Sequence, residues 1–73
     1  MKNKDQVFRV EGVVLANLGK GLYRVRLEKA NREILAFVSG KMRKYSIQIL
    51  INDRVEVEMS IYDMGKGRIV LRK

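Results

Sequence analysis

The residues with the clearest chemical potential are three cations, Lys41, Arg43 and Lys44, which directly follow a small-residue turn, Ser39-Gly40. Ammonium and guanidinium groups at this density bind phosphate, and a fixed geometry makes such a group more selective than a flexible basic tail. Apolar residues flank the three cations on both sides and predict that they are anchored to a core. Helical spacing spreads them around one turn, which suits an irregular phosphate backbone better than a straight groove. We call these three residues the helix cluster.

Other candidate contacts to nucleic acid lie on either side of the helix cluster along the chain. Alternation places Arg24 and Arg26 on the outward side of residues 22–28, and Phe37 on the same side of the next strand. A base can stack on an exposed aromatic ring while neighbouring guanidinium groups meet phosphates, as in recognition of single-stranded RNA. The alternative is that Phe37 covers an end of the fold or packs under a loop. The last part of the chain adds Lys66, Arg68 and Arg72 to the candidate RNA-binding residues.

The composition favours a polyanionic partner and disfavours catalysis. Sixteen Lys and Arg against eight Asp and Glu give the 73-residue chain a formal net charge of +8. Because these charges are grouped, nucleic acid is favoured over the alternative, an excess of cations for solubility alone. Histidine and cysteine are absent, which excludes a thiolate metal site and a histidine-activated nucleophile. Glu56 and Glu58 lie on one strand face rather than across a cleft, so we predict no enzyme, no metal and no cofactor.

Short segments of alternating apolar and polar residues predict an all-β fold in one RNA-binding domain that spans residues 1–73. Ser39 is expected to cap one helical turn, residues 40–44, that packs through Met42. This order predicts a five-stranded OB-fold barrel with a short helical turn between strands three and four. The main alternative, a small SH3-like barrel, lacks a helix at that point. The expected strands lie at residues 8–16, 22–28, 33–38, 54–59 and 68–72, with a loop over residues 60–66.

Two strands carry more specific expectations. Gly12 interrupts the inward row of the first strand, and a glycine inside a strand usually marks a bulge or a sharp bend. In the last strand, alternation predicts that Ile69 and Leu71 both point into the core. Both expectations concern how the barrel closes, because they lie on the strands that begin and end it.

Several motifs together resemble the bacterial and plastid translation initiation factor one family over nearly the whole chain. In chain order they are Glu11-Gly12-Val13-Val14, Leu22-Tyr23-Arg24-Val25-Arg26-Leu27, Ser39-Gly40-Lys41-Met42-Arg43-Lys44, Ile47-Gln48-Ile49-Leu50, Asp53-Arg54-Val55, and Tyr62-Asp63 with Gly67-Arg68-Ile69. The positions that match the family's basic RNA contacts are Lys41, Arg43, Lys44, Lys66 and Arg68. The chain departs from the family pattern in having Phe37 for a common histidine, Gln48 for an arginine, Asn52 for a glycine and Ile61 for a proline.

The resemblance implies a translation initiation factor that binds rRNA of the small ribosomal subunit in the decoding region, where aminoacyl-tRNA later enters. It implies occlusion of that site during initiation, in cooperation with the other translation initiation factors. We expect a monomer in the bacterial cytoplasm or the plastid stroma. No membrane partner is expected, because no segment approaches the ~20 apolar residues that cross a bilayer.

The residues alone leave two other functions open. A general single-stranded RNA-binding chaperone of the cold-shock type stacks several aromatics on one sheet face, and this chain offers Phe37 with Tyr45 or Tyr62. A protein-interaction adaptor would place its basic face against an acidic partner. Comparison of binding to isolated oligonucleotides and to intact small subunits separates the chaperone from the initiation factor. If the protein is an adaptor, its binding should survive treatment of the partner fraction with ribonuclease.

Overall fold

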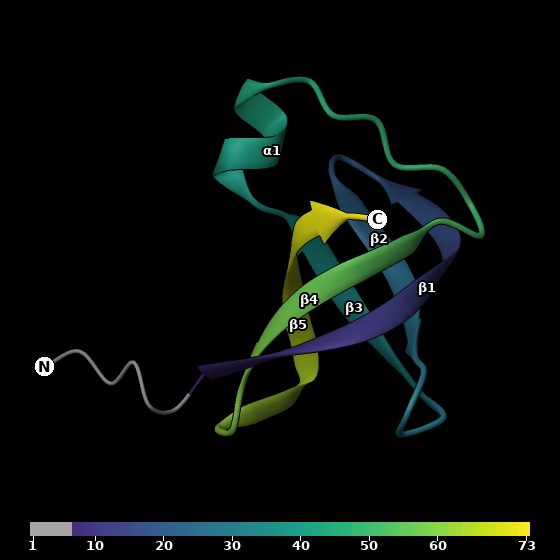
Figure 1. Ribbon diagram of the computed structural model, residues 1–73, viewed down its shortest axis with the longest axis vertical. Helices are drawn as coiled ribbons and strands as arrows, with labels where there is room; N and C mark the ends of the chain where they lie inside the picture. Colours follow the sequence, from purple (N-terminus) through teal and green to yellow (C-terminus); the bar gives the residue numbers. More distant parts are fainter. Residues whose placement is uncertain (1–6) are drawn as a thin grey trace, which may run out of the picture.

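The computed structural model describes residues 7–73, which form five β-strands and one short α-helix (Figure 1). The helix lies between the third and fourth strands, as the sequence predicts. The first six residues of the predicted domain lie outside the described residues. Within the described part, no helix is long and apolar enough to cross a membrane. The elements are β1 (Val7–Gly19), β2 (Leu22–Leu27), β3 (Arg32–Val38), α1 (Gly40–Lys44), β4 (Arg54–Ser60) and β5 (Asp63–Arg72).

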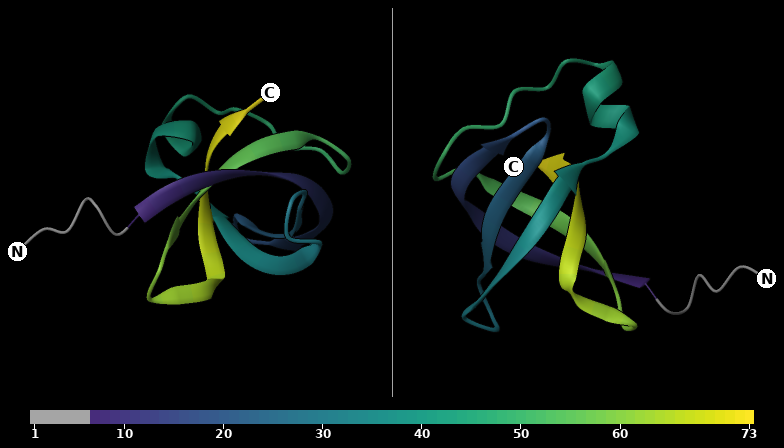
Figure 2. Two further views of the ribbon diagram at one scale, coloured as in Figure 1. Left: turned by 60° about the horizontal axis from the view of Figure 1, so that its bottom comes forward. Right: turned by 180° about the vertical axis from the view of Figure 1, so that it is seen from behind.

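The strands close into a barrel in the order β1-β2-β3-β5-β4 (Figure 2). The long strand β1 serves both halves, because Gly12–Gly19 pair with β2 and Val7–Val13 pair with β4. Strands β3 and β5 run parallel from Leu35 and Lys66 onward, whereas the other neighbours are antiparallel. This five-stranded closed barrel with its intervening helix is the predicted OB-fold.

An apolar core fills the barrel because alternate residues of each strand point inward. Met42 of α1 and Ile49 of the segment that follows it add to this core from outside the strands. Removal of these side chains from water is the main term that stabilises the barrel. The buried apolar residues are Val14, Val25, Leu27, Ile34, Ala36, Met42, Ile49, Val55, Val57, Met59 and Ile69.

The last strand begins earlier than the sequence predicts. Ser60 pairs with Asp63, so only Ile61 and Tyr62 remain in the turn between β4 and β5. The expected loop over residues 60–66 is therefore wrong. The glycine-rich sequence that suggested a loop instead forms the first half of β5, where it pairs with β4 and β3.

The inward orientation predicted for Leu71 is also wrong, since its side chain is 46% exposed. Glu56 pairs with Leu71, whereas the next residue, Val57, pairs with Ile69. The extra residue on β5 interrupts the alternation, and Leu71 shares the outer side with Glu56. Such an irregularity is defined by the pairing with β4, so the alternation of apolar and polar residue types in the sequence of β5 does not reveal it.

Gly12 allows strand β2 to approach β1 closely and does not mark a bulge. The register is regular at Gly12, and the shifts of β1 against β2 lie further along, after Val14 and after Asn17. A methyl group on Gly12 would lie 2.5 Å from Cγ1 of Val25 and 2.9 Å from the carbonyl oxygen of Arg26. Neither neighbour is free to move, because both belong to the strand paired with β1. A residue without a side chain is therefore needed where β1 passes from one half of the barrel to the other.

We predict that Gly12→Ala lowers the free energy of unfolding by about 1–3 kcal/mol, the usual effect of forcing an extra methyl group into a packed interior. Urea denaturation followed by circular dichroism measures this change. The matched control is Gly40→Ala, because a methyl group at Gly40 meets no atom within 4 Å. We expect that control to change stability by about 1 kcal/mol or less. Equal unfolding midpoints for Gly12→Ala and the unmodified protein would contradict the close-approach argument.

Candidate nucleic-acid interface

The helix cluster lies on α1, and local sequence explains why a helix begins there. The Ser39 hydroxyl accepts a hydrogen bond from the backbone N–H of Met42 at 3.2 Å, which is the predicted N-cap. Five residues are too few for a stable isolated helix, so packing must hold it. The Met42 side chain supplies that packing, since it is only 2% exposed. The three cations of the helix cluster all remain exposed.

Backbone hydrogen bonds fix the position of α1 at one end of the barrel, beside the turn between β1 and β2 (Figure 1). The N–H of Ser39 donates to the carbonyl of Ile69 at 2.9 Å. The N–H of Val38 donates to the carbonyl of Gly21 at 3.0 Å. The residues that lead into the helix are thus tied to β5 on one side and to the β1–β2 turn on the other.

Arg72, a predicted RNA contact, holds the segment that follows the helix. Its guanidinium lies 3.4 Å from the Asp53 carboxylate and donates to the backbone carbonyl of Gln48 at 3.2 Å. The Asp53 carboxylate also accepts from the N–H of Leu50 at 2.8 Å. Arg72 therefore has a clear structural use, and we place it outside the candidate interface. A role for Arg72 in binding RNA stays a prediction.

The outer surface of β2, β3 and β5 brings most of the other predicted residues together, and we call it the basic face. Registered partners on neighbouring strands point to the same side of a sheet, so each set of partners forms a row. The row nearest α1 includes the aromatic residue, and the next two rows lie progressively further from the helix. The rows consist of Leu22, Phe37 and Arg68, then Arg24, Leu35 and Lys66, then Arg26 and Glu33.

Phe37 is exposed at the centre of its row. Its side chain has 49% of its surface accessible, so the ring neither seals the barrel nor packs beneath a loop. Arg68 is its neighbour on β5. The helix α1 begins at Gly40, only three residues after Phe37. An accessible ring beside a guanidinium group and close to the helix cluster matches the arrangement used for stacking unpaired bases.

Two arginines of the basic face have carboxylate partners. Nε of Arg24 lies 3.9 Å from a carboxylate oxygen of Glu33, and the Arg68 guanidinium contacts the Glu58 carboxylate. All four side chains retain access to solvent. Ion pairs that water still reaches are weak, so each arginine can exchange its carboxylate for a phosphate at little cost.

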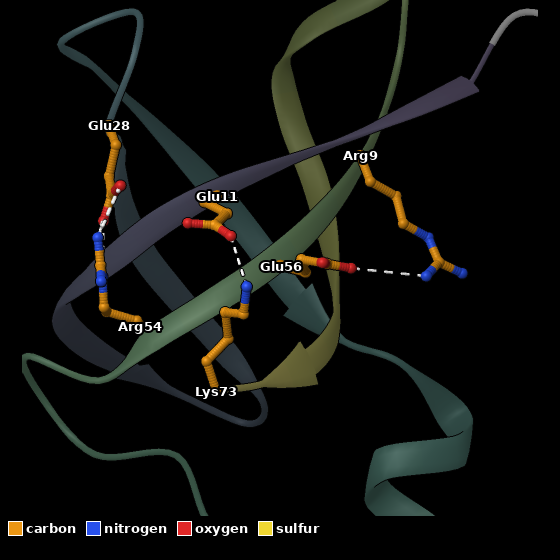
Figure 3. A network of polar contacts seen from close by, with 6 residues as sticks. All are labelled: Arg9, Glu11, Glu28, Arg54, Glu56 and Lys73. Carbon is orange, nitrogen blue, oxygen red and sulfur yellow. Dashed lines mark hydrogen bonds and ion pairs between the residues drawn. The ribbon is translucent and has the colours of Figure 1, made fainter.

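Three further ion pairs gather around β1 and β4, as Figure 3 shows, and join Arg9 to Glu56, Arg54 to Glu28 and Lys73 to Glu11. The hydrogen bond from Lys73 lowers the pKa of the Glu11 carboxyl below its usual value. A carboxyl group with a lowered pKa in the folded state stabilises the protein above its ordinary titration range, and this contribution disappears as the pH falls through that lowered pKa. These carboxylates neutralise cations away from the helix cluster.

The cations that have no ion-pair partner among residues 7–73 include every member of the helix cluster. The Lys44 ammonium does lie 5.9 Å from the ring centre of Tyr45, but this contact leaves its charge in place. The helix cluster therefore keeps its full charge for a ligand. The unpaired cations of the described residues are Lys20, Arg26, Lys29, Arg32, Lys41, Arg43, Lys44 and Lys66.

Lys20 joins the helix cluster at the same end of the barrel, although the sequence did not single it out. Gly19 pairs with Leu22, so Lys20 and Gly21 form a two-residue turn between β1 and β2. Both have positive φ angles, 55° and 79°, as in a type I′ turn. The hydrogen bond from Val38 to Gly21 brings this turn against the residues that precede α1. Only the fold reveals this proximity, because the turn and the helix lie about twenty residues apart in the sequence.

Fold and site together define a class of protein, the small OB-fold barrels that carry cations and an exposed aromatic on one face, as RNA-binding modules do. The chain belongs to the family Translation initiation factor 1A / IF-1, whose model matches residues 1–73. It is 50% identical to translation initiation factor IF-1 from the Wolbachia endosymbiont strain TRS of Brugia malayi. The solution structure of that protein matches with a TM-score of 0.78 over 99% of this chain and 83% of that chain. The family predicted from the motifs is confirmed.

Two larger proteins contain a similar barrel. YjeQ from Thermotoga maritima is 27% identical, with a TM-score of 0.74 over 90% of this chain and 23% of its own. Eukaryotic translation initiation factor 5A from Methanococcus jannaschii is 15% identical, with a TM-score of 0.68 over 92% of this chain and 44% of its own. The second likeness is one of fold alone.

Proposed function

We propose that this translation initiation factor binds the small ribosomal subunit at the decoding region and occludes the site of tRNA entry during initiation. The observation that carries the proposal is the helix cluster, three cations without ion-pair partners among residues 7–73, on a helix anchored to a rigid barrel. Family membership supports a partner in the initiation machinery. We expect the protein to act as a monomer in the bacterial cytoplasm, together with the other initiation factors.

In this mechanism the cations bind rRNA phosphates while Phe37 stacks on an unpaired base. Lys41, Arg43 and Lys44 make the first contacts, since they have no carboxylates to release. Lys66 adds its free ammonium, and Arg24, Arg26 and Arg68 extend the contact along the basic face. The described part of the protein, which extends 33 × 29 × 20 Å along its principal axes, then blocks tRNA by its bulk. No covalent bond is made or broken in these steps.

Chemical footprinting of small subunits, with and without the protein, tests the proposed location. We expect protection of rRNA bases in the decoding region and little change elsewhere. Protection confined to another region of the subunit would overturn the proposed site. Equal affinity for unstructured oligonucleotides and for intact subunits would instead favour the chaperone of the cold-shock type.

The double variant Arg43→Ala/Lys44→Ala is expected to bind small subunits about ten- to a hundredfold more weakly, because two cations that meet phosphate are removed. Its melting temperature should change little, since both side chains are exposed. The log–log dependence of affinity on salt should also become shallower, by roughly 0.7 for each phosphate that the variant no longer neutralises.

The matched control for this variant is Lys29→Ala/Arg32→Ala, which removes two unpaired cations at the other end of the barrel, near the turn between β2 and β3 (Figure 1). The control has the same net charge as the double variant. If both lose affinity to the same extent, binding reflects net charge alone and the helix cluster has no special role.

Phe37→Ala should weaken subunit binding by about 1–3 kcal/mol, the usual contribution of stacking one base on an aromatic ring. Tyr62→Ala provides the control, because Tyr62 is 72% exposed but lies in the β4–β5 turn, away from α1. Affinity can be measured by fluorescence anisotropy of the labelled protein against purified subunits. Unchanged affinity of Phe37→Ala would remove stacking from the mechanism and leave a purely electrostatic contact.

A further inference from the structure

The Arg43 guanidinium lies directly against the β1–β2 turn at Gly21. A methyl group on Gly21 would lie 2.8 Å from Nη2 and 3.8 Å from Cζ of Arg43. These distances are shorter than or equal to van der Waals contact, so the guanidinium occupies the space that a side chain on Gly21 would need. Gly21 and Arg43 thus meet across the end of the barrel, although they belong to different elements.

The backbone at Gly21 provides a contact for the end of the Arg43 side chain. Among residues 7–73, Arg43 has no carboxylate within ion-pair distance, and its side chain is exposed on a helix of five residues. An arginine side chain held only at its Cα samples many rotamers, and ordering it on a ligand costs conformational entropy. A surface that limits those rotamers in advance lowers this cost.

The turn itself is well placed to provide such a surface. Gly21 has a φ of +79° within the two-residue turn, which is a conformation that L side chains rarely adopt. Its carbonyl accepts the hydrogen bond from Val38, at the end of the strand that leads into α1. The turn and the helix that carries Arg43 are therefore connected through one short path and keep a fixed relative position.

We infer that Gly21 is a positioning residue for Arg43. By lacking a side chain, Gly21 allows the guanidinium to lie on the turn and holds it in the orientation in which it meets an rRNA phosphate. This inference rests on the proposed function, because it assumes that Arg43 binds phosphate. It also gives a role to the β1–β2 turn, which contains none of the cations that the sequence analysis assigned to the interface.

The test compares Gly21→Ala with Gly19→Ala. Gly19 has a φ of +92°, and a methyl group placed on it would meet nothing within 4 Å, so its substitution strains the same hairpin without touching Arg43. We expect similar decreases in melting temperature for the two variants. Only Gly21→Ala should bind small subunits more weakly, by about two- to tenfold, which corresponds to the entropy of one freed side chain. Both glycine variants should keep the original salt dependence, whereas Arg43→Ala should have a shallower one, because the freed guanidinium of Gly21→Ala still neutralises its phosphate once bound.

A double-mutant cycle with Arg43→Ala separates positioning from general damage to the turn. In the Arg43→Ala background, Gly21→Ala should cost no more affinity than Gly19→Ala does. Equal affinities of Gly21→Ala and Gly19→Ala in the unmodified background would overturn the inference while leaving the proposed function intact. If Arg43→Ala itself binds as tightly as the unmodified protein, the phosphate contact fails and the inference fails with it.

A measurement on the unmodified protein keeps the inference testable even if Gly21→Ala does not fold. In nuclear magnetic resonance spectra, we expect nuclear Overhauser effects between the Gly21 α-protons and the Arg43 side-chain protons. The Nε–H group of Arg43 should also relax as a more ordered group than that of Arg32, which is exposed and has no ion-pair partner among residues 7–73. Absence of these effects, with equal relaxation of the two groups, would show that the turn does not hold Arg43.

Discussion

Burial of the Met42 side chain is the interaction on which the proposed binding end of the molecule depends. A helix of five residues has too few internal hydrogen bonds to form alone, and its Ser39 cap adds only one more. With Met42 in the core, the backbone is fixed and the cations on the same helical turn are held outside it. Hydrophobic free energy inside the barrel is thus what gives the charges on its surface a defined geometry. The same burial fixes where the segment toward Ile49, also in the core, leaves the helix.

The charges are sorted as well as fixed. Carboxylates pair with cations around β1 and β4, whereas α1 has no acidic residue in its first turn and no ion pair to its cations within the described residues. Screening in physiological salt acts over about 8 Å, so carboxylates elsewhere on the barrel do little to neutralise the helix cluster. A chain of modest size therefore presents an undiminished positive charge at one end. The exposed ring of Phe37 borders that end, where the proposed mechanism has it stack on a base.

Local patterns in the sequence predicted the elements, whereas features that depend on strand pairing were beyond them. Alternation located the strands apart from the first half of β5, and a serine before a short basic run located the helix and its buried methionine. Leu71 was misplaced because an irregular pairing with β4 moves it outward. For the site, the exposed aromatic and the helix cluster were found from residue type and spacing. The carboxylate partner of Arg68 depends on the register of the β4–β5 hairpin. The bracing role of Arg72 and the nearness of Lys20 to the helix cluster depend on contacts between distant segments, so only the closed barrel discloses them.

The parallel pairing of β3 with β5 has a consequence for how the protein comes to be folded. β1, β2 and β3 form successive antiparallel neighbours, which chain segments can assemble locally, but β5 contributes two of the ladders and is the last strand along the sequence. The barrel therefore cannot close until this final strand is available. Because β5 docks on β3 across a long stretch of chain, the entropy lost in closing that loop slows folding. During synthesis, the emerging chain carries its cations before it has the barrel to arrange them. Recognition of the proposed kind is thus acquired in a single late step, when the last strand enters the sheet.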